Sequence, residues 1–172
     1  PPAFLIEQVR LRFELQETGT RVFSEMQVRR NLQAKEHSST LFLHGEGLRH
    51  CWVKIDGELL AGDAMQITEE GLTLLSPPDH FVFSSKVEIA PENNTALEGL
   101  YRSSNMFCTQ CEAEGFRKIT WFMDRPDVMA RFHVRIEADK ARYPVLLSNG
   151  NPGVSGDLAD GRHFAEWDDP IP

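Results

Sequence analysis

The run FLIEQVRLRFELQETGTRVFSEMQVRRNL, residues 4–32, holds two alternating segments with a turn between them. Apolar residues at positions 9, 11, 13 and 15 alternate with polar residues at 8, 10, 12 and 14. This period of two places apolar side chains on one face of a β-strand and polar side chains on the other. Glu17-Thr18-Gly19 is a turn signal, and the alternation resumes from Arg21 to Leu32. The run therefore predicts a long antiparallel hairpin with one buried face and one face in water.

Further segments predict short strands, separated by turn residues at a spacing of roughly ten residues. The expected strands are residues 41–43, 48–55, 58–60, 65–67, 72–75, 81–89, 131–138, 144–147 and 163–167. Asp56-Gly57 predicts a tight hairpin turn, and the stretch from Asn151-Pro152-Gly153 to Asp160-Gly161 predicts a loop or a hairpin. The helical candidate, Ala113 to Phe122, is so short that it needs tertiary packing. The predicted fold class is all-β, an antiparallel β-sandwich or curled sheet with one short helix near residues 113–122.

The composition suits a single domain with a substantial core, since the chain is 172 residues long. Its net charge of −8 argues against a nucleic-acid partner, because phosphate backbones are bound by cations. No apolar run is long enough to cross a bilayer, and Pro1-Pro2 lead straight into a strand pattern without a signal peptide, so we expect no membrane partner. The missing initiator Met suggests a trimmed chain. Three cysteines do not make a disulfide framework, and we expect a cytoplasmic protein.

The least generic segment is LEGLYRSSNMFCTQCEAEGFRKITWFMDRPD, residues 97–127. It gathers thiols, acidic residues and aromatic residues in an irregular stretch between strand patterns, where binding residues tend to lie. Within it, Gln110 and Glu112 alternate with Thr109 and Cys111. If the chain is extended there, both polar side chains point to the same side. Taken alone, this pattern favours two solvated polar side chains.

Metal and redox motifs are incomplete in this sequence. No histidine pair forms the H-E-x-x-H motif that binds zinc on a helix, and His44 and His50 are interpreted as ordinary surface or strand residues. Cys108 and Cys111 form one C-x-x-C, which supplies only half of the ligands of a structural zinc. A redox function would need this motif at a helix N-terminus with a depressed thiol pKa, whereas its flanks resemble strands. We therefore interpret the two cysteines as reduced thiols packed near a domain interface.

Three segments carry a resemblance to a known family: ALEGLY at 96–101, CTQCEAEGFR at 108–117 and DRPDVMARF at 124–132. They closely resemble the N-terminal domain of the bacterial zinc aminopeptidases of the M1 family. The family pattern is T-Q-x-E, a short helix and then D-x-P, which corresponds here to residues 109–112 and 124–126. The similarity continues through residues 143–151 and 167–170, so it covers at least 95–170 and, more weakly, the strands before them.

This resemblance implies that residues 1–172 are a single N-terminal β domain of a zinc-dependent aminopeptidase that removes N-terminal amino acids from peptides. The zinc would belong to the full-length enzyme, in a catalytic domain of the same polypeptide that is absent from this chain. We therefore expect the fragment to bind no metal and to be inactive by itself. The family motif implies substrate-binding roles for Gln110, Glu112 and Ala113, with Glu112 binding the free amino group at the peptide substrate's N-terminus. It also implies a cis peptide bond between Glu112 and Ala113.

Other parts of the segment are interpreted as structural. Asp124, Arg125 and Asp127 are expected to form a turn network around Pro126 that fixes the loop. The alternative function is a non-catalytic β-sandwich that binds protein or carbohydrate, which exposed aromatic residues on a flat face would favour. If a catalytic partner is missing instead, we expect an exposed apolar patch. The expected members of this patch are Leu100, Met106, Phe107, Phe116 and Trp121.

Overall fold

The computed structural model describes residues 1–35 and 37–172, and strands are the main elements within these ranges. The strands up to residue 89 are β1 (Phe4–Glu14), β2 (Thr20–Arg30), β3 (Leu41–His44), β4 (Arg49–Ile55), β5 (Glu58–Leu59), β6 (Met65–Ile67), β7 (Gly71–Leu74) and β8 (His80–Ile89). Those that follow are β9 (Gly99–Ser103), β10 (Met106–Gln110), β11 (Arg131–Asp139), β12 (Asn151–Asp157) and β13 (Arg162–Asp169). Short 3₁₀ helices are η1 (Gly62–Ala64), η2 (Pro91–Asn93) and η3 (Phe116–Lys118). The predicted all-β class is confirmed.

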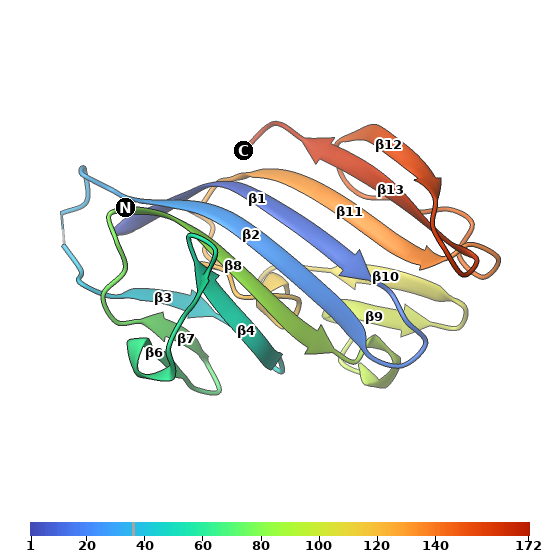
Figure 1. Cartoon of the computed structure of the whole chain (residues 1–172), viewed down its shortest axis with the longest axis horizontal. Coiled ribbons are helices and arrows are strands. Elements are labelled where there is room, and N and C mark those ends of the chain that lie inside the picture. Colours follow the sequence, from blue (N-terminus) through green and yellow to red (C-terminus); the bar gives the residue numbers. More distant parts are fainter. Residues whose placement is uncertain (36) are drawn as a thin grey trace.

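Eight strands form one large sheet in the order β12-β13-β11-β1-β2-β8-β4-β5. In Figure 1 this sheet curls across the molecule, and two small sheets, β10-β9 and β3-β7-β6, lie along one side of it. The predicted hairpin of β1 and β2 is confirmed and lies near the centre of the large sheet, with Val9 opposite Met26. One pairing in this otherwise antiparallel sheet is parallel. β1 runs parallel to β11, with Val9 opposite Phe132, which the long connection between the two strands permits.

The core lies between the large sheet and the small ones. Val9, Val22 and Phe83 come from β1, β2 and β8 and are completely buried. Leu43 of β3 and Leu72 of β7 belong to the same apolar cluster. The alternation read from residues 4–32 therefore marks the face of the sheet that packs against the small sheets.

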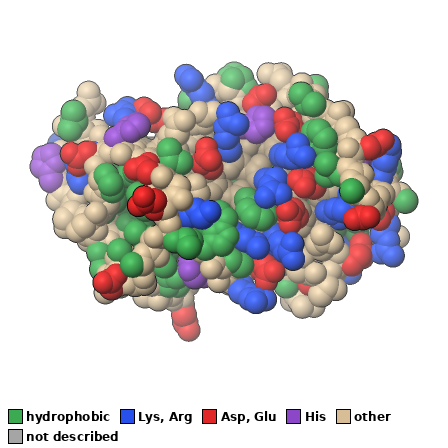
Figure 2. Space-filling view, viewed as in Figure 1, with side chains coloured by type: hydrophobic (Ala, Val, Ile, Leu, Met, Phe, Trp, Pro, Cys, Tyr) green, Lys and Arg blue, Asp and Glu red, His purple; other side chains and the backbone are tan. Residues whose placement is uncertain are grey.

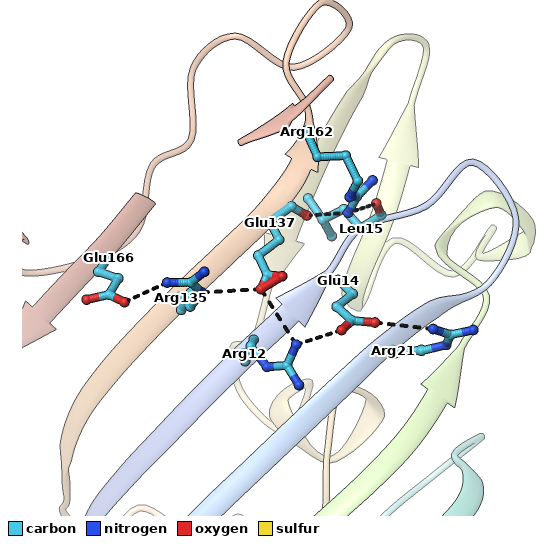
Figure 3. A network of polar contacts seen from close by, with 8 residues as sticks. All are labelled: Arg12, Glu14, Leu15, Arg21, Arg135, Glu137, Arg162 and Glu166. Carbon is cyan, nitrogen blue, oxygen red and sulfur yellow. Dashed lines mark hydrogen bonds and ion pairs between the residues drawn. The ribbon is translucent and has the colours of Figure 1, made fainter. Parts of the chain in front are cut away.

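The opposite face of the large sheet carries a network of ion pairs (Figure 3). Nη1 of Arg12 on β1 lies 2.6 Å from Oε1 of Glu14 and 3.6 Å from Oε2 of Glu137 on β11. Arg135 continues the network at 3.2 Å from Glu137 and 3.0 Å from Glu166 on β13. These contacts bridge the parallel pair of strands. Figure 2 shows basic and acidic side chains interleaved on the visible face of the molecule.

The helix predicted over residues 113–122 is wrong in extent. Only η3 is helical there, and it is a 3₁₀ turn in which the backbone N of Ile119 donates to the carbonyl of Phe116 at 2.9 Å. The next residues explain why no longer helix forms. Residues 119–123 are buried one after another, whereas a helix would turn some of them to solvent. Phe122 instead exchanges two backbone hydrogen bonds with His44 of β3, at 2.8 and 3.1 Å.

The strand predicted at 144–147 is also wrong, since these residues have no strand pairing. Side chains of β13 hold this segment in place of a backbone ladder. Nε2 of His163 donates to the carbonyl of Tyr143 at 2.7 Å, and Nε1 of Trp167 donates to the carbonyl of Leu146 at 3.1 Å. The choice left open for residues 151–161 resolves to a hairpin, because β12 and β13 pair antiparallel.

Candidate functional site

The distinctive segment forms a hairpin followed by a tight loop. β9 and β10 pair antiparallel, and Gln110, the last residue of β10, lies opposite Gly99. Gly99 has a φ of +74°, which favours glycine, and a Cβ there would lie 2.9 Å from the Cβ of Lys118. At Gly115 a Cβ would lie 2.4 Å from the carbonyl oxygen of Gln110. The two glycines thus allow the strand end, the loop and η3 to lie against one another.

The end of β10 and the loop between β10 and η3 present the three predicted substrate-binding residues. Gln110, Glu112 and Ala113 are all exposed. The peptide bond between Glu112 and Ala113 is cis, which confirms the expectation from the resemblance. The backbone N of Gly115 donates to the carbonyl of Cys111 at 2.8 Å and closes the loop on itself. Glu112 therefore stands on a short, closed loop that is open to solvent, and Gln110 ends the strand that leads into this loop.

Arg117 fastens η3 to the next part of the chain. Its backbone N and its Nε donate to Oδ2 of Asp124 at 3.2 and 3.0 Å, and its Nη2 donates to the carbonyl of Asp124 at 3.1 Å. The backbone N of Asp124 in turn donates to Nδ1 of His44, the last residue of β3, at 3.2 Å. Burial, followed by the charge of Arg117, lowers the pKa of His44, and this favours the neutral ring that accepts this hydrogen bond.

This network changes the interpretation of the D-R-P-D turn. Asp124 pairs with Arg117 across the loop, while Arg125 makes a separate pair with Asp127 at 2.8 and 2.7 Å. The hydrogen bond from Arg125 lowers the pKa of Asp127. The sequence offered one signal for the first pair, an Arg and an Asp that flank an apolar run. The sequence offered no signal for the contact between Asp124 and His44, because that contact depends on where β3 packs.

An open apolar cavity of about 640 Å³ lies beside the β9-β10 hairpin. Of residues 106–112, the lining includes 106–109 and 111, so Gln110 and Glu112 lie outside it. Val145 and Leu147, which also line it, are 69% and 70% exposed. Further apolar lining comes from Phe13, Phe107, Phe132, Val134 and Leu146. The domain therefore has an uncovered apolar surface next to the candidate loop.

The membership predicted for the apolar patch is only partly correct. Leu100 and Trp121 are buried, because Leu100 belongs to the core cluster and Trp121 lies in the buried run after η3. Phe107 and Phe116 are half-buried, and Met106 is exposed. The exposed apolar surface is thus centred on the cavity rim and not on the whole of the 100–121 segment.

Cys111 does not show the electrostatics of a redox thiol. Cys51, Cys108 and Cys111 are free thiols. Burial, followed by the charge of Asp124, raises the pKa of Cys111, which is opposite to the shift that a redox thiol needs. Among residues 1–35 and 37–172, no group of three or more His, Cys, Asp or Glu side chains is placed to hold a metal ion. In the same ranges, no helix has the length and apolar character that a membrane span requires.

Comparisons with known proteins agree along the whole chain. A profile of the peptidase M1 N-terminal domain matches residues 8–172. Aminopeptidase N of Caulobacter vibrioides is 54% identical over 172 residues, which are 100% of this chain and 20% of that protein. Aminopeptidase N of Escherichia coli is 44% identical over 171 residues, which are 99% of this chain and 19% of that protein. The chain therefore spans about one fifth of the length of these curated relatives.

Solved structures show the same architecture. Aminopeptidase A of Legionella pneumophila, crystallised in complex with aspartic acid, matches with a TM-score of 0.93 at 28% identity, over 100% of this chain and 20% of that one. An M1 zinc metallopeptidase from Deinococcus radiodurans matches with a TM-score of 0.77 at 16% identity, over 100% and 41% of the two chains. At that identity the second match shows the fold alone.

Proposed function

Since the chain belongs to the peptidase M1 N-terminal domain family, we propose that residues 1–172 form a single N-terminal β domain of a zinc-dependent aminopeptidase. The complete polypeptide would remove N-terminal amino acids from peptides. In it, this domain presents the loop Gln110–Ala113 to the free amino end of the substrate. The observation that carries this assignment is the exposed, closed loop with Glu112 at its centre, in a chain 54% identical to an aminopeptidase N.

Glu112 has the chemistry that this role requires. A peptide's α-amino group has an ordinary pKa of about 7.7–8.0, so it is mostly an ammonium ion at neutral pH. A carboxylate is the natural counter-charge for it, and Gln110 adds a neutral donor and acceptor on the same loop. A glutamate on a closed loop is held in place more firmly than one on a free chain end, which reduces the entropy lost on binding.

The partner that we propose for the apolar cavity is the catalytic domain of the same polypeptide. Val145 and Leu147 at the rim, with Met106 nearby, leave apolar surface exposed beside the loop. Monomers rarely leave large apolar patches uncovered. Covering this one with the catalytic domain would bring the loop to the edge of the active-site cleft and exclude water from it.

The zinc of this proposal is assigned to the catalytic domain. The described residues of this chain offer no suitable ligand set for it, so their contribution is to bind and orient the substrate. The three free thiols suit a reducing compartment, and we place the enzyme in the cytoplasm.

The alternative of a protein- or carbohydrate-binding module has less support. Its expected feature was a flat face with exposed aromatic rings. On the outer face of the large sheet, Phe23 is covered by the guanidinium of Arg12 at 3.9 Å, and Trp52 by the ammonium of Lys54 at 4.5 Å. Both rings are half-buried, so neither is free to stack on a sugar.

The test is hydrolysis by the full-length polypeptide of alanine p-nitroanilide and of its N-acetylated form. We expect cleavage of the first compound only, loss of activity with a zinc chelator and recovery with added zinc. Equal cleavage of both compounds would contradict recognition of the amino end. Binding of a glycan or protein by a full-length polypeptide that cleaves neither compound would favour the alternative.

A further inference from the structure

We propose that Arg117, Asp124 and His44 form a positioning network that holds the Gln110–Ala113 loop in the geometry that binds the substrate's amino group. This inference rests on the proposed function of the loop. It goes beyond that function by assigning a role to three side chains that would not themselves contact substrate.

The loop is held at its two ends by different means. At its start, β10 pairs with β9, and Gln110 lies opposite Gly99. At its end, the position of η3 depends on Arg117, which directs one backbone and two side-chain donors to Asp124. Three donors from one residue to one acceptor residue fix both the distance and the rotation of the turn. Glu112 stands between these two fixed points.

Asp124 is itself anchored to the core. Its backbone N donates to Nδ1 of His44 at 3.2 Å, and Phe122, two residues earlier in the chain, is paired with His44 through the backbone. The backbone N of Glu46 also donates to the carbonyl of Arg117 at 2.9 Å. The end of the loop is therefore connected to β3, which belongs to a different sheet from β10, and to the turn after β3.

A second Arg–Asp pair in the same segment provides a matched comparison. The side chains of Arg117 and Asp124 are 18% and 12% exposed, whereas those of Arg125 and Asp127 are 47% and 44% exposed. Arg125 and Asp127 are two residues apart and contact each other in solvent, so their pair does not connect the loop to another element. Exposed pairs contribute little, while a shielded pair that also bonds the backbone can fix a loop.

The expected consequence is a loss of catalytic efficiency without a comparable loss of folding. In the full-length polypeptide, Asp124→Asn should lower kcat/KM for alanine p-nitroanilide, by up to about 100-fold if Glu112 shifts by about 1 Å. The isosteric Asp127→Asn removes the same charge from the exposed pair and should leave kcat/KM near the wild-type value. Arg117→Lys keeps the positive charge but loses the second side-chain donor, and it should reproduce most of the loss.

A double-mutant cycle separates positioning from a general structural effect. If Asp124 acts through Glu112, Asp124→Asn should cost little in a Glu112→Gln background, and the two losses should not add. The second measurement is the affinity of alaninamide for the metal-stripped full-length polypeptide, measured by calorimetry, with N-acetylalaninamide as the reference. Asp124→Asn should weaken alaninamide and leave the acetylated compound unchanged.

The outcomes distinguish the inference from the function on which it rests. If Glu112→Gln lowers alaninamide affinity but Asp124→Asn behaves like Asp127→Asn, the positioning network is refuted and the function stands. Fully additive losses of Asp124→Asn and Glu112→Gln would also refute it. If Glu112→Gln itself has no effect, the proposed loop function fails and the network's role fails with it. If the Asp124→Asn variant does not fold, the same measurements of kcat/KM and alaninamide affinity on the Arg117→Lys variant test the positioning network instead.

Discussion

The two faces of the large sheet differ in the polarity of their side chains. On the outer face, acidic and basic side chains pair with one another, and Arg12 and Arg135 stack on Phe23 and Phe164 at 3.9 and 3.7 Å. The charged side chains of that face therefore find their partners on the face itself, which is in contact with water. The inner face is apolar, and near β9 and β10 it ends in an open cavity with Val145 exposed at its rim. The outer face is therefore satisfied by its own side chains, whereas the inner face leaves apolar surface uncovered.

Phe83→Ala should give the largest effect, and it tests the inner face. Phe83 is fully buried at the centre of β8, so truncation removes apolar contacts and leaves a cavity. We expect a loss of about 3–5 kcal/mol in the free energy of unfolding. The measurement is urea unfolding of the 172-residue chain, whose wild type should first show a β-type far-UV spectrum. A loss below about 1 kcal/mol would mean that the core lies elsewhere.

Glu112→Ala should give the next largest effect, on activity and not on stability. A shielded charge pair that loses one partner typically costs about 2–5 kcal/mol. At about 1.4 kcal/mol per factor of ten, this is roughly a 30-fold to several-thousand-fold loss of kcat/KM for unblocked substrates. An equal contact in ground and transition states would raise KM alone. Gln110→Ala should cost less, about 0.5–1.5 kcal/mol, because it removes a neutral hydrogen bond.

Steady-state kinetics of both variants in the full-length polypeptide check this expectation, with thermal melting as the folding control. Glu112 is exposed in this chain, so its truncation should not change the melting temperature of the 172-residue domain. A wild-type kcat/KM for Glu112→Ala would mean that the residue is a solvated loop side chain.

Sequence patterns predicted the regular parts of this molecule well. The alternation in residues 4–32 gave the central hairpin and its buried face, because period-two patterns are local and need only one sheet face to be covered. The same reasoning failed at 144–147, where apolar residues are held by side chains of β13. It failed again at 113–122, because consecutive apolar residues fit a buried extended segment as well as a helix.

The candidate loop was found in the sequence only through its resemblance to a family. Gln110 and Glu112 by themselves have the composition of ordinary surface residues. The contact between His44 and Asp124 joins positions that are far apart in the chain and was beyond sequence reasoning. The parallel pairing of β1 with β11 was missed for the same reason, since register between distant strands depends on the whole topology.

Leu147→Ser tests whether the cavity rim is an interface. Leu147 is 70% exposed in this chain, so its substitution should change the stability of the 172-residue domain by no more than about 0.5 kcal/mol. In the full-length polypeptide, burial of this side chain against a partner would contribute about 1.5–3 kcal/mol, which the variant should lose. Thermal melting of both forms makes the comparison. Equal small changes in both would show that this rim stays in solvent.

Lower pH should weaken the anchoring of the candidate loop. Burial and the charge of Arg117 lower the pKa of His44 below its ordinary 6.5, despite the opposing backbone hydrogen bond with Phe122 and the charges of Asp124 and Glu114. The folded chain then binds fewer protons than the unfolded chain, so stability should fall as pH drops below 6.5 toward the lowered pKa. His44→Gln should make the melting temperature less dependent on pH between these limits. An unchanged pH profile would show that His44 does not titrate differently on folding.

Arg21→Ala should give the smallest effect, and it tests the outer face. Arg21 on β2 lies 3.4 Å from Glu14 and 3.7 Å from Glu88, with its side chain 49% exposed. Exposed pairs of this kind typically contribute about 0.2–1 kcal/mol, because solvent and salt screen them and ordering the side chains costs entropy. The variant should therefore lose at most about 1 kcal/mol of unfolding free energy, and less at 1 M salt, where the screening length shrinks to about 3 Å. Its kcat/KM in the full-length polypeptide should stay at the wild-type value. A larger loss of activity from Arg21→Ala than from Gln110→Ala would overturn the contrast between the two faces, because it would place a functional contact on the side whose charges are already paired.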